Sequence, residues 1–171
     1  MNENPRIEIM DTTLRDGEQT SGVSFVPHEK LMIARLLLEE LRVDRIEVAS
    51  ARVSEGEFNA VRMICDWAAR KNLLSRVEVL GFVDGKTSVD WIYNTGCRVI
   101  NLLTKGSEKH CTFQLKKTLQ EHLADIRQTV AYAIDKGMDV NVYLEDWSNG
   151  IKDSPDYVFG LVDGLKDTGI R

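Results

Sequence analysis

Residues 11–19 read DTTLRDGEQ and bring an arginine, an amide and several carboxylates into one short segment. The carboxylate of Asp16 is a hard oxygen ligand of the kind that divalent cations prefer. The guanidinium of Arg15 can hold a carboxylate in a two-pronged contact or stabilise an oxyanion as it forms. Gly17 permits a tight backbone turn. The segment therefore suits metal-assisted chemistry on an anionic substrate, although a surface turn in which Arg15 and Asp16 merely pair is the simpler alternative.

The segments around this string alternate between β-rich runs and helical patterns. Strands are expected at 7–11, 45–49, 77–81, 99–103 and 140–144, and helices at 27–41, from 54, from 87, from 118, and from 154 to about 166. This βαβα order predicts parallel strands joined by right-handed crossovers. An open doubly wound sheet and a (β/α)8 barrel both fit the order.

The helical patterns carry local signals of their own. In the first helix, Leu31, Ala34, Leu38 and Leu41 recur at helical spacing and predict one buried apolar stripe. The Ser-x-x-Glu pattern at 54–57 and the Thr-x-x-Glu pattern at 118–121 each predict a capping box at a helix start.

The positions of the polar residues separate the two architectures. Polar groups follow the first strand and also stand at 50–52, 104–105 and 145–146, directly after later strands. Functional groups of a barrel gather at the carboxyl ends of its strands. No G-x-G-x-x-G follows the first strand, which weighs against a dinucleotide fold. We therefore expect an α/β chain that forms part of a TIM barrel, with about five of the eight βα units.

Composition excludes several classes of protein. The chain has 171 residues, a formal net charge of −5, 43% hydrophobic and 29% charged residues. It lacks a membrane-length apolar run, a secretory signal and a basic patch, so neither a membrane nor nucleic acid is expected as a partner, and a cytoplasmic location is expected. The three cysteines show no C-x-x-C spacing and are expected to be reduced.

The string at 11–19 resembles that of the metal-dependent acyl-CoA condensing enzymes of the aldolase-type barrel superfamily, the 2-isopropylmalate, homocitrate and (R)-citramalate synthases. Four further segments share the resemblance, at 43–52, 79–85, 101–107 and 141–150. The segments keep the family's order and span nearly the whole chain, and the resemblance is greatest to the citramalate synthase branch. It implies that residues 1–171 are the N-terminal part of the catalytic barrel, with the remaining strands and any regulatory domain outside this sequence.

The resemblance implies roles for individual residues. Asp16 corresponds to the metal-ligating carboxylate, where the homocitrate branch usually has Glu. Arg15 corresponds to the catalytic residue that polarises the 2-oxo group, and Gln19 to a substrate contact. Glu145 corresponds to the catalytic acidic residue that binds acetyl-CoA or activates its methyl group. Tyr143 is expected to share the inward face of that strand, since strand side chains alternate.

The resemblance also implies a pocket for the side chain of the oxo acid. Leu80 and Leu103 correspond to pocket-lining positions, although both also suit an ordinary barrel core. Two leucines and Tyr143 leave little room, which favours pyruvate over 2-oxoisovalerate as the substrate. His110, in the loop after the fourth strand, is a candidate substrate contact.

The implied reaction is a Claisen condensation of acetyl-CoA with a 2-oxo acid, helped by a divalent ion (zinc, manganese or magnesium) and serving branched-chain amino-acid biosynthesis. The family takes two further metal ligands from an H-x-H at strand seven, and this sequence contains no H-x-H. We therefore expect the 171 residues alone to be inactive. Open sheet edges and an exposed apolar inner face would favour association, so a homodimer is expected.

Three alternatives stay open at this point. The first is 2-isopropylmalate synthase, which runs the same reaction on a larger oxo acid. The second is an acyl-CoA lyase of the same superfamily, whose active-site cysteine lies in a later loop that this sequence does not contain. The third belongs to another class: a non-catalytic fragment or short homologue that only binds a partner.

Overall fold

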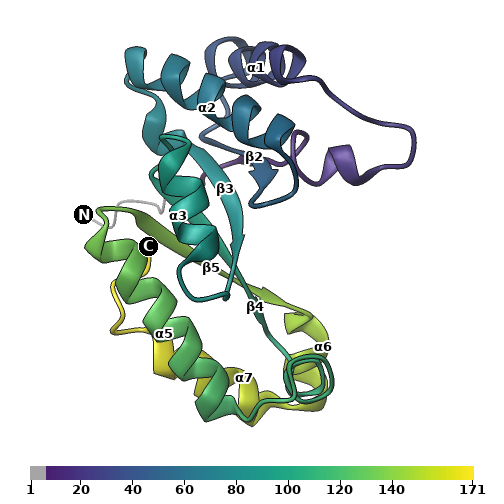
Figure 1. Cartoon of the computed structure of the whole chain (residues 1–171). Helices are drawn as coiled ribbons and strands as arrows, with labels where there is room; N and C mark the ends of the chain where they lie inside the picture. The colour runs from purple at the N-terminus through teal and green to yellow at the C-terminus, as the bar shows by residue number, and fades with distance from the viewer. Residues whose placement is uncertain (1–6) are drawn as a thin grey trace, which may run out of the picture.

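The computed structural model describes residues 7–171 and contains one parallel sheet with the strand order β1-β2-β3-β4-β5. The strands are β1 (Met10–Asp11), β2 (Arg45–Ser50), β3 (Val77–Phe82), β4 (Val99–Lys105) and β5 (Asp139–Glu145). The longer helices are α1 (Pro27–Arg35), α2 (Glu55–Arg70), α3 (Thr87–Asn94), α5 (Leu119–Asp135), α6 (Trp147–Asp153) and α7 (Pro155–Leu165). The helices follow one another in chain order around the sheet, from α1 and α2 at one end to α5 and α7 at the other (Figure 1). The predicted five βα units of a barrel are confirmed.

The core lies between the outer face of the sheet and the helices. Alternate strand residues are fully buried there, and the helices contribute Ala, Val, Ile and Leu to the same cluster. The strand members of this layer are Ile46, Val48, Val77, Val79, Ile100, Leu102 and Val140. Burial of this aliphatic layer is the main source of cohesion in the fold.

The inner face of the sheet carries a row of polar residues alongside apolar ones, which corrects the expectation of an apolar inner face. Glu47 pairs in register with Glu78, and Asn101 pairs with Asn141. Glu47, Glu78 and Asn101 are fully buried. The period-2 alternation of each strand sends its aliphatic residues to the helices and these residues to the inside. The open edges of the sheet remain as the reason to expect association.

The sheet curves strongly, as part of a barrel must. The Tyr143 hydroxyl on β5 donates to Sδ of Met10 on β1 at 3.2 Å, although these strands lie at opposite edges of the sheet. All five strands run parallel, so their carboxyl ends meet at one rim. The loops that carry the candidate site residues start from this rim.

The first helix follows its predicted span but changes geometry. After α1 the chain continues as a π-helix, η2 (Leu36–Leu41), which ends at Arg42 with φ 59°. Ala34 and Leu38 of the predicted stripe are buried, whereas Leu41 is 68% exposed. The wider π-turn rotates Leu41 off the stripe, so the prediction was wrong for that residue.

The first strand and one cap also differ from expectation. Only Met10–Asp11 form β1, and Ile7 and Ile9 of the predicted strand are exposed. At the start of α2, Ser54 accepts the Glu57 amide, but the Glu57 side chain turns to Lys30 instead of closing the box. The box at 118–121 is complete. Within residues 7–171, no helix is long and apolar enough to cross a membrane.

Candidate active site

A tight turn at the end of β1 presents Arg15. The carbonyl of Thr12 accepts the amides of Arg15, Asp16 and Gly17 at 3.1, 2.8 and 3.1 Å. A short 3-10 helix, Gly17–Gln19, follows directly. This bonding folds the chain back on itself, so that Arg15 lies over the rim of the sheet and Gln19 stays exposed beside it.

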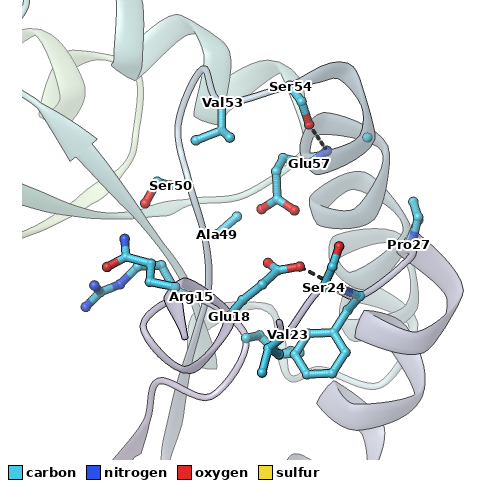
Figure 2. A pocket seen from close by; sticks show the side chains of 14 residues that line it. Arg15, Glu18, Val23, Ser24, Pro27, Ala49, Ser50, Val53, Ser54 and Glu57 are labelled. Carbon is cyan, nitrogen blue, oxygen red and sulfur yellow. Dashed lines mark hydrogen bonds between the residues drawn. The ribbon is translucent and has the colours of Figure 1, made fainter. Parts of the chain in front are cut away.

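A cavity of about 410 Å³ opens between this turn and the ends of β2 and α2 (Figure 2). Its lining includes Arg15 and Gln19, so the structure brings these two predicted residues together. Glu18 and Glu57 also line it, and Figure 2 shows their carboxylates turned toward each other. The cavity therefore joins a cationic group, an amide and two carboxylates at the rim.

Beneath the turn, Arg15 is held by a buried carboxylate on β2. Nε of Arg15 donates to Oε2 of Glu47 at 2.5 Å, and Nη1 donates to Oδ1 of Asp16 at 2.8 Å. Nη2 has no acceptor among the described residues. An arginine fixed at Nε and Nη1 keeps Nη2 as a preorganised donor toward an anionic ligand.

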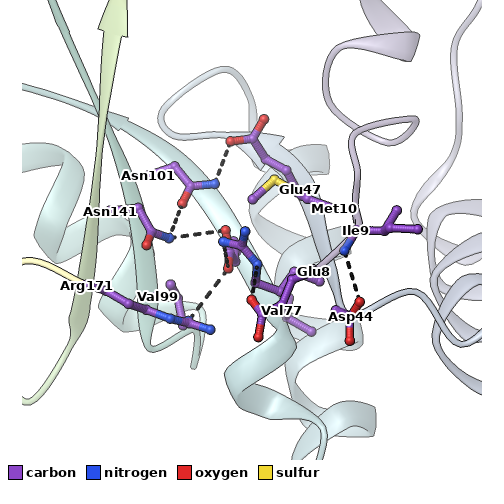
Figure 3. Close-up of polar contacts among 12 residues, drawn as sticks. Glu8, Ile9, Met10, Asp44, Glu47, Val77, Val99, Asn101, Asn141 and Arg171 are labelled. Atoms are coloured by element: carbon purple, nitrogen blue, oxygen red, sulfur yellow. Dashed lines mark hydrogen bonds and ion pairs between the residues drawn. The ribbon is translucent and has the colours of Figure 1, made fainter. Parts of the chain in front are cut away.

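Glu47 belongs to a hydrogen-bonded row that crosses the inner face of the sheet (Figure 3). Its Oε1 accepts Nδ2 of Asn101 at 2.7 Å, and Oδ1 of Asn101 accepts Nδ2 of Asn141 at 2.7 Å. Asn141 also donates to Oε2 of Glu78 at 3.2 Å. Arg45 and Arg171 reach the other Glu78 oxygen at 3.3 and 3.7 Å.

Burial on the inner face raises the pKa of two groups, Glu78 and Tyr143. Burial raises the pKa of Glu78 above its ordinary range, and Arg45 opposes that shift. Burial also raises the pKa of Tyr143, and the nearby charges of Glu47 and Glu78 raise it further. Tyr143 is therefore a neutral phenol at physiological pH, on the inward face where the sequence placed it.

A second cavity, of about 570 Å³, lies at the rim beside β5. Leu103, Tyr143 and Glu145 line it together, and Trp147 of α6 adds an indole that the sequence reading missed. Glu145 forms an ion pair with Lys105, its register partner on β4. The structure thus places Arg15 and Gln19 at the first cavity, and Leu103, Tyr143 and Glu145 at the second.

Leu80 and His110 line neither cavity. Leu80 is 5% exposed and lies on the inner face beside Asn101. His110 faces Asp146, with Nε2 3.5 Å from Oδ2, while its buried Nδ1 has no partner among the described residues. The Ser107 hydroxyl donates to the same Asp146 oxygen at 2.7 Å, and this bond lowers the pKa of Asp146.

Asp16 points outward, and its side chain is 61% exposed. Within residues 7–171 no group of three His, Cys, Asp or Glu side chains could hold a metal ion. These residues therefore do not make a metal centre by themselves. Their own chemistry rests on an oriented arginine, carboxylates and amides.

Sequence reasoning missed the residues that support Arg15 from below. Glu47, Glu78, Asn101 and Asn141 each stand inside a strand that is otherwise rich in aliphatic residues. A polar residue at the same period-2 position in four neighbouring strands was the signal that could have identified this row. It marks the inner face of the sheet as a polar interior.

Comparisons with known proteins place the chain in a family. Residues 6–170 match the family described as HMGL-like. The chain is 42% identical over 142 residues to the 2-isopropylmalate synthase of Saccharolobus solfataricus, covering 82% of this chain and 35% of that protein. It is 37% identical to the putative (R)-citramalate synthase of Methanopyrus kandleri, covering 95% of this chain and 30% of that protein. It is 42% identical to the homocitrate synthase AksA of the same organism, covering 81% of this chain and 33% of that protein. The chain thus spans about a third of the length of these relatives.

The fold is shared with solved structures. The HMG-CoA lyase of Bacillus subtilis superposes with a TM-score of 0.67 at 19% identity, covering 99% of this chain and 57% of that one. The HMG-CoA lyase of Brucella melitensis gives a TM-score of 0.65 at 19% identity, with 98% and 59% covered. At this identity the likeness concerns the fold, and it agrees with a curved parallel sheet that makes up part of a barrel.

Proposed function

This chain belongs to the HMGL-like family, and from that premise we propose that the enzyme containing its barrel condenses acetyl-CoA with a 2-oxo acid and releases CoA. The observation that carries the proposal is the clamped Arg15 at the rim of the sheet. Its guanidinium is fixed by Glu47 and Asp16, while Nη2 remains available to a ligand. Such a group suits a substrate whose carbonyl oxygen becomes negatively charged during the reaction.

The reaction needs a base and a stabilised oxyanion. A carboxylate, proposed to be Glu145, takes a proton from the methyl group of acetyl-CoA. The resulting enolate carbon attacks the keto carbon, and the keto oxygen becomes an alkoxide that Arg15 stabilises. Protonation of the alkoxide and attack of water on the thioester give the hydroxy diacid and free CoA.

The ion pair with Lys105 fixes the position of the Glu145 carboxylate at the rim. Lys105 keeps the carboxylate oriented along the rim, and 40% of the Glu145 side chain stays exposed to an incoming thioester. We also propose Asp16 as one oxygen ligand of a divalent ion, which would need further ligands beyond the described residues. That ion would act as a Lewis acid toward the oxo acid.

Pyruvate is the proposed oxo acid. Leu103 and Tyr143 are register partners on neighbouring strands and line the same cavity. Leu80 lies on the same inner face, one strand further along. Bulky side chains at these positions support a small substituent on the substrate, with Gln19 and His110 as further proposed contacts.

A thiol-release assay tests the proposal. The full product of the gene that encodes this chain is assayed with acetyl-CoA and either pyruvate or 2-oxoisovalerate, with and without a chelator. We expect CoA release that depends on pyruvate, stops with the chelator, and falls at least about 10²-fold in Arg15→Lys, which keeps the charge but loses the fork geometry. Release with 2-oxoisovalerate alone would overturn the substrate assignment, and no release with any 2-oxo acid would overturn the function.

Two further proposals concern the chain itself. The 171 residues alone should release no CoA, because the described part of the chain lacks a metal centre. We also propose a homodimer, which sedimentation would test, and a cytoplasmic location, which fractionation of the source cells would test.

A further inference from the structure

Lys30 of α1 is fully buried beneath the turn that carries Arg15. Its side chain is 0% exposed, and its Nζ lies 2.5 Å from Oε2 of Glu18 and 2.6 Å from Oε1 of Glu57. The same Nζ donates to the carbonyl oxygens of Leu14 at 3.1 Å and Val48 at 3.3 Å. Four acceptors thus surround one ammonium group that has no access to water.

A buried lysine is costly unless it is paired, so this arrangement must hold its partners firmly. The partners come from three separate segments. Leu14 and Glu18 belong to the turn after β1, Val48 lies near the end of β2, and Glu57 lies in the first turn of α2. Lys30 therefore connects the turn to the two elements that form the opposite wall of the 410 Å³ cavity.

The contacts to the turn flank its functional residues. Leu14 directly precedes Arg15, and Glu18 directly precedes Gln19. The other Glu18 oxygen accepts the Phe25 amide at 2.8 Å, which ties down the far end of the same loop. Among the described residues, the loop has no strand ladder of its own, so these polar contacts act with the burial of Leu14 and the bond of Arg15 to Glu47 to set its position.

We propose that Lys30 is a positioning residue for the condensation. It holds residues 14–25 so that Arg15 and Gln19 face the substrate, and it does so through Glu18 and the Leu14 carbonyl. This inference rests on the proposed function for its kinetic consequence, whereas the ordering of the loop is tested separately. A purely structural lysine would stabilise the fold without a selective effect on this loop.

Two carboxylate variants give a matched comparison, since each removes one negative charge from beside Lys30. Glu18→Gln weakens the link to the loop, whereas Glu57→Gln weakens only the link to α2. Hydrogen exchange of the chain measures protection of the amides in 14–25. We expect exchange there to rise about tenfold or more in Glu18→Gln and in Lys30→Met, and to stay near that of the unmodified chain in Glu57→Gln.

A control for general destabilisation is Ile126→Ala, a cavity variant in α5 at a position that is 0% exposed. It should lower overall stability without raising the exchange rate of residues 14–25 more than that of the strands. Equal loop exchange in Glu18→Gln and Glu57→Gln, or a loop response in Ile126→Ala as large as in Glu18→Gln, would overturn the proposal. If Lys30→Met does not fold, Glu18→Gln against Glu57→Gln still decides the question.

Kinetics of the full gene product separate positioning from stability. With pyruvate varied, kcat/KM should fall about 10²-fold in Glu18→Gln and change little in Ile126→Ala, because a displaced turn misplaces Arg15 whereas a cavity in α5 does not. KM for acetyl-CoA should stay within about twofold, since Glu145, the proposed base for that substrate, lies at the other cavity. Unchanged kinetics in a Glu18→Gln protein with a loosened loop would overturn the inference. Absence of synthase activity in the unmodified protein would instead overturn the proposed function and leave the exchange test decisive for the loop.

Discussion

Replacing Glu47 with glutamine should weaken the fold at the point where the candidate site is anchored. The Glu47 side chain is fully buried, with Oε2 2.5 Å from Nε of Arg15 and Oε1 2.7 Å from Nδ2 of Asn101. Both neighbours are donors, so a carboxylate satisfies both. Glutamine has one acceptor oxygen and one amino group, and in either orientation its amino group faces a donor.

The size of the effect follows from the burial of the two partners. Breaking a buried ion pair from one side costs about 3–5 kcal/mol. Arg15 remains 16% exposed and keeps its 2.8 Å contact with Asp16, which lowers the cost for the stranded cation. We therefore expect Glu47→Gln to lose about 2–3 kcal/mol of unfolding free energy.

Urea denaturation followed by circular dichroism measures this loss, and Glu78→Gln is the matched control. Glu78 is equally buried, but its arginine partners lie at 3.3 and 3.7 Å, and burial raises its pKa above the ordinary range. Its variant should lose about 1 kcal/mol or less. Equal losses in the two variants, or a Glu47→Gln loss below about 0.5 kcal/mol, would refute the reasoning about Arg15.

Three smaller predictions follow. Gly150→Ala should lower stability by about 3 kcal/mol or more in thermal unfolding, because its Cβ would lie 2.1 Å from the Gly106 carbonyl oxygen. Gly56→Ala on α2 should instead raise stability by about 0.5 kcal/mol, because its Cβ would meet only an ordinary contact at 3.5 Å. Thr118→Ala removes the side-chain acceptor that caps α5 and should cost about 1 kcal/mol in urea unfolding, with an unchanged midpoint contradicting the cap. Burial lowers the pKa of His122, so as the pH falls the imidazole is protonated in the unfolded chain before it is protonated in the folded chain. The free energy of unfolding should therefore fall as the pH drops below about 6.5. His122→Gln should flatten that fall between about pH 7 and 5.

The sequence predicted the elements that repeat a local pattern. Four of the five strands and the starts of the main helices follow from hydrophobic alternation and caps, and the capping box at Thr118 is present as predicted. Arg15 and Gln19 were found together because they are close in the chain. The βα order and the polar strand ends predicted the partial barrel, and the family resemblance added roles for individual residues such as Leu103 and Glu145 near the ends of β4 and β5.

Contacts between segments that are far apart in the chain could not be predicted from the local sequence patterns. Lys30 looks like an ordinary solvated helix residue in the sequence, and only the approach of Leu14, Val48 and Glu57 buries it. The same competition diverted Glu57 from its cap, since a buried ammonium is a stronger partner than a backbone amide. The π-turn that exposes Leu41 likewise has no signature in hydrophobic spacing.

The division of the sheet into an aliphatic outer face and a polar inner face has an evolutionary consequence. The outer face supplies most of the cohesion, so inner residues outside the hydrogen-bonded row of Glu47 can be exchanged at a lower cost to folding than residues of the outer layer. Under the proposed function, replacement of Leu103 or Tyr143 would reshape the proposed substrate pocket while the scaffold persists. A lineage built on such a sheet can diversify its chemistry one inward side chain at a time.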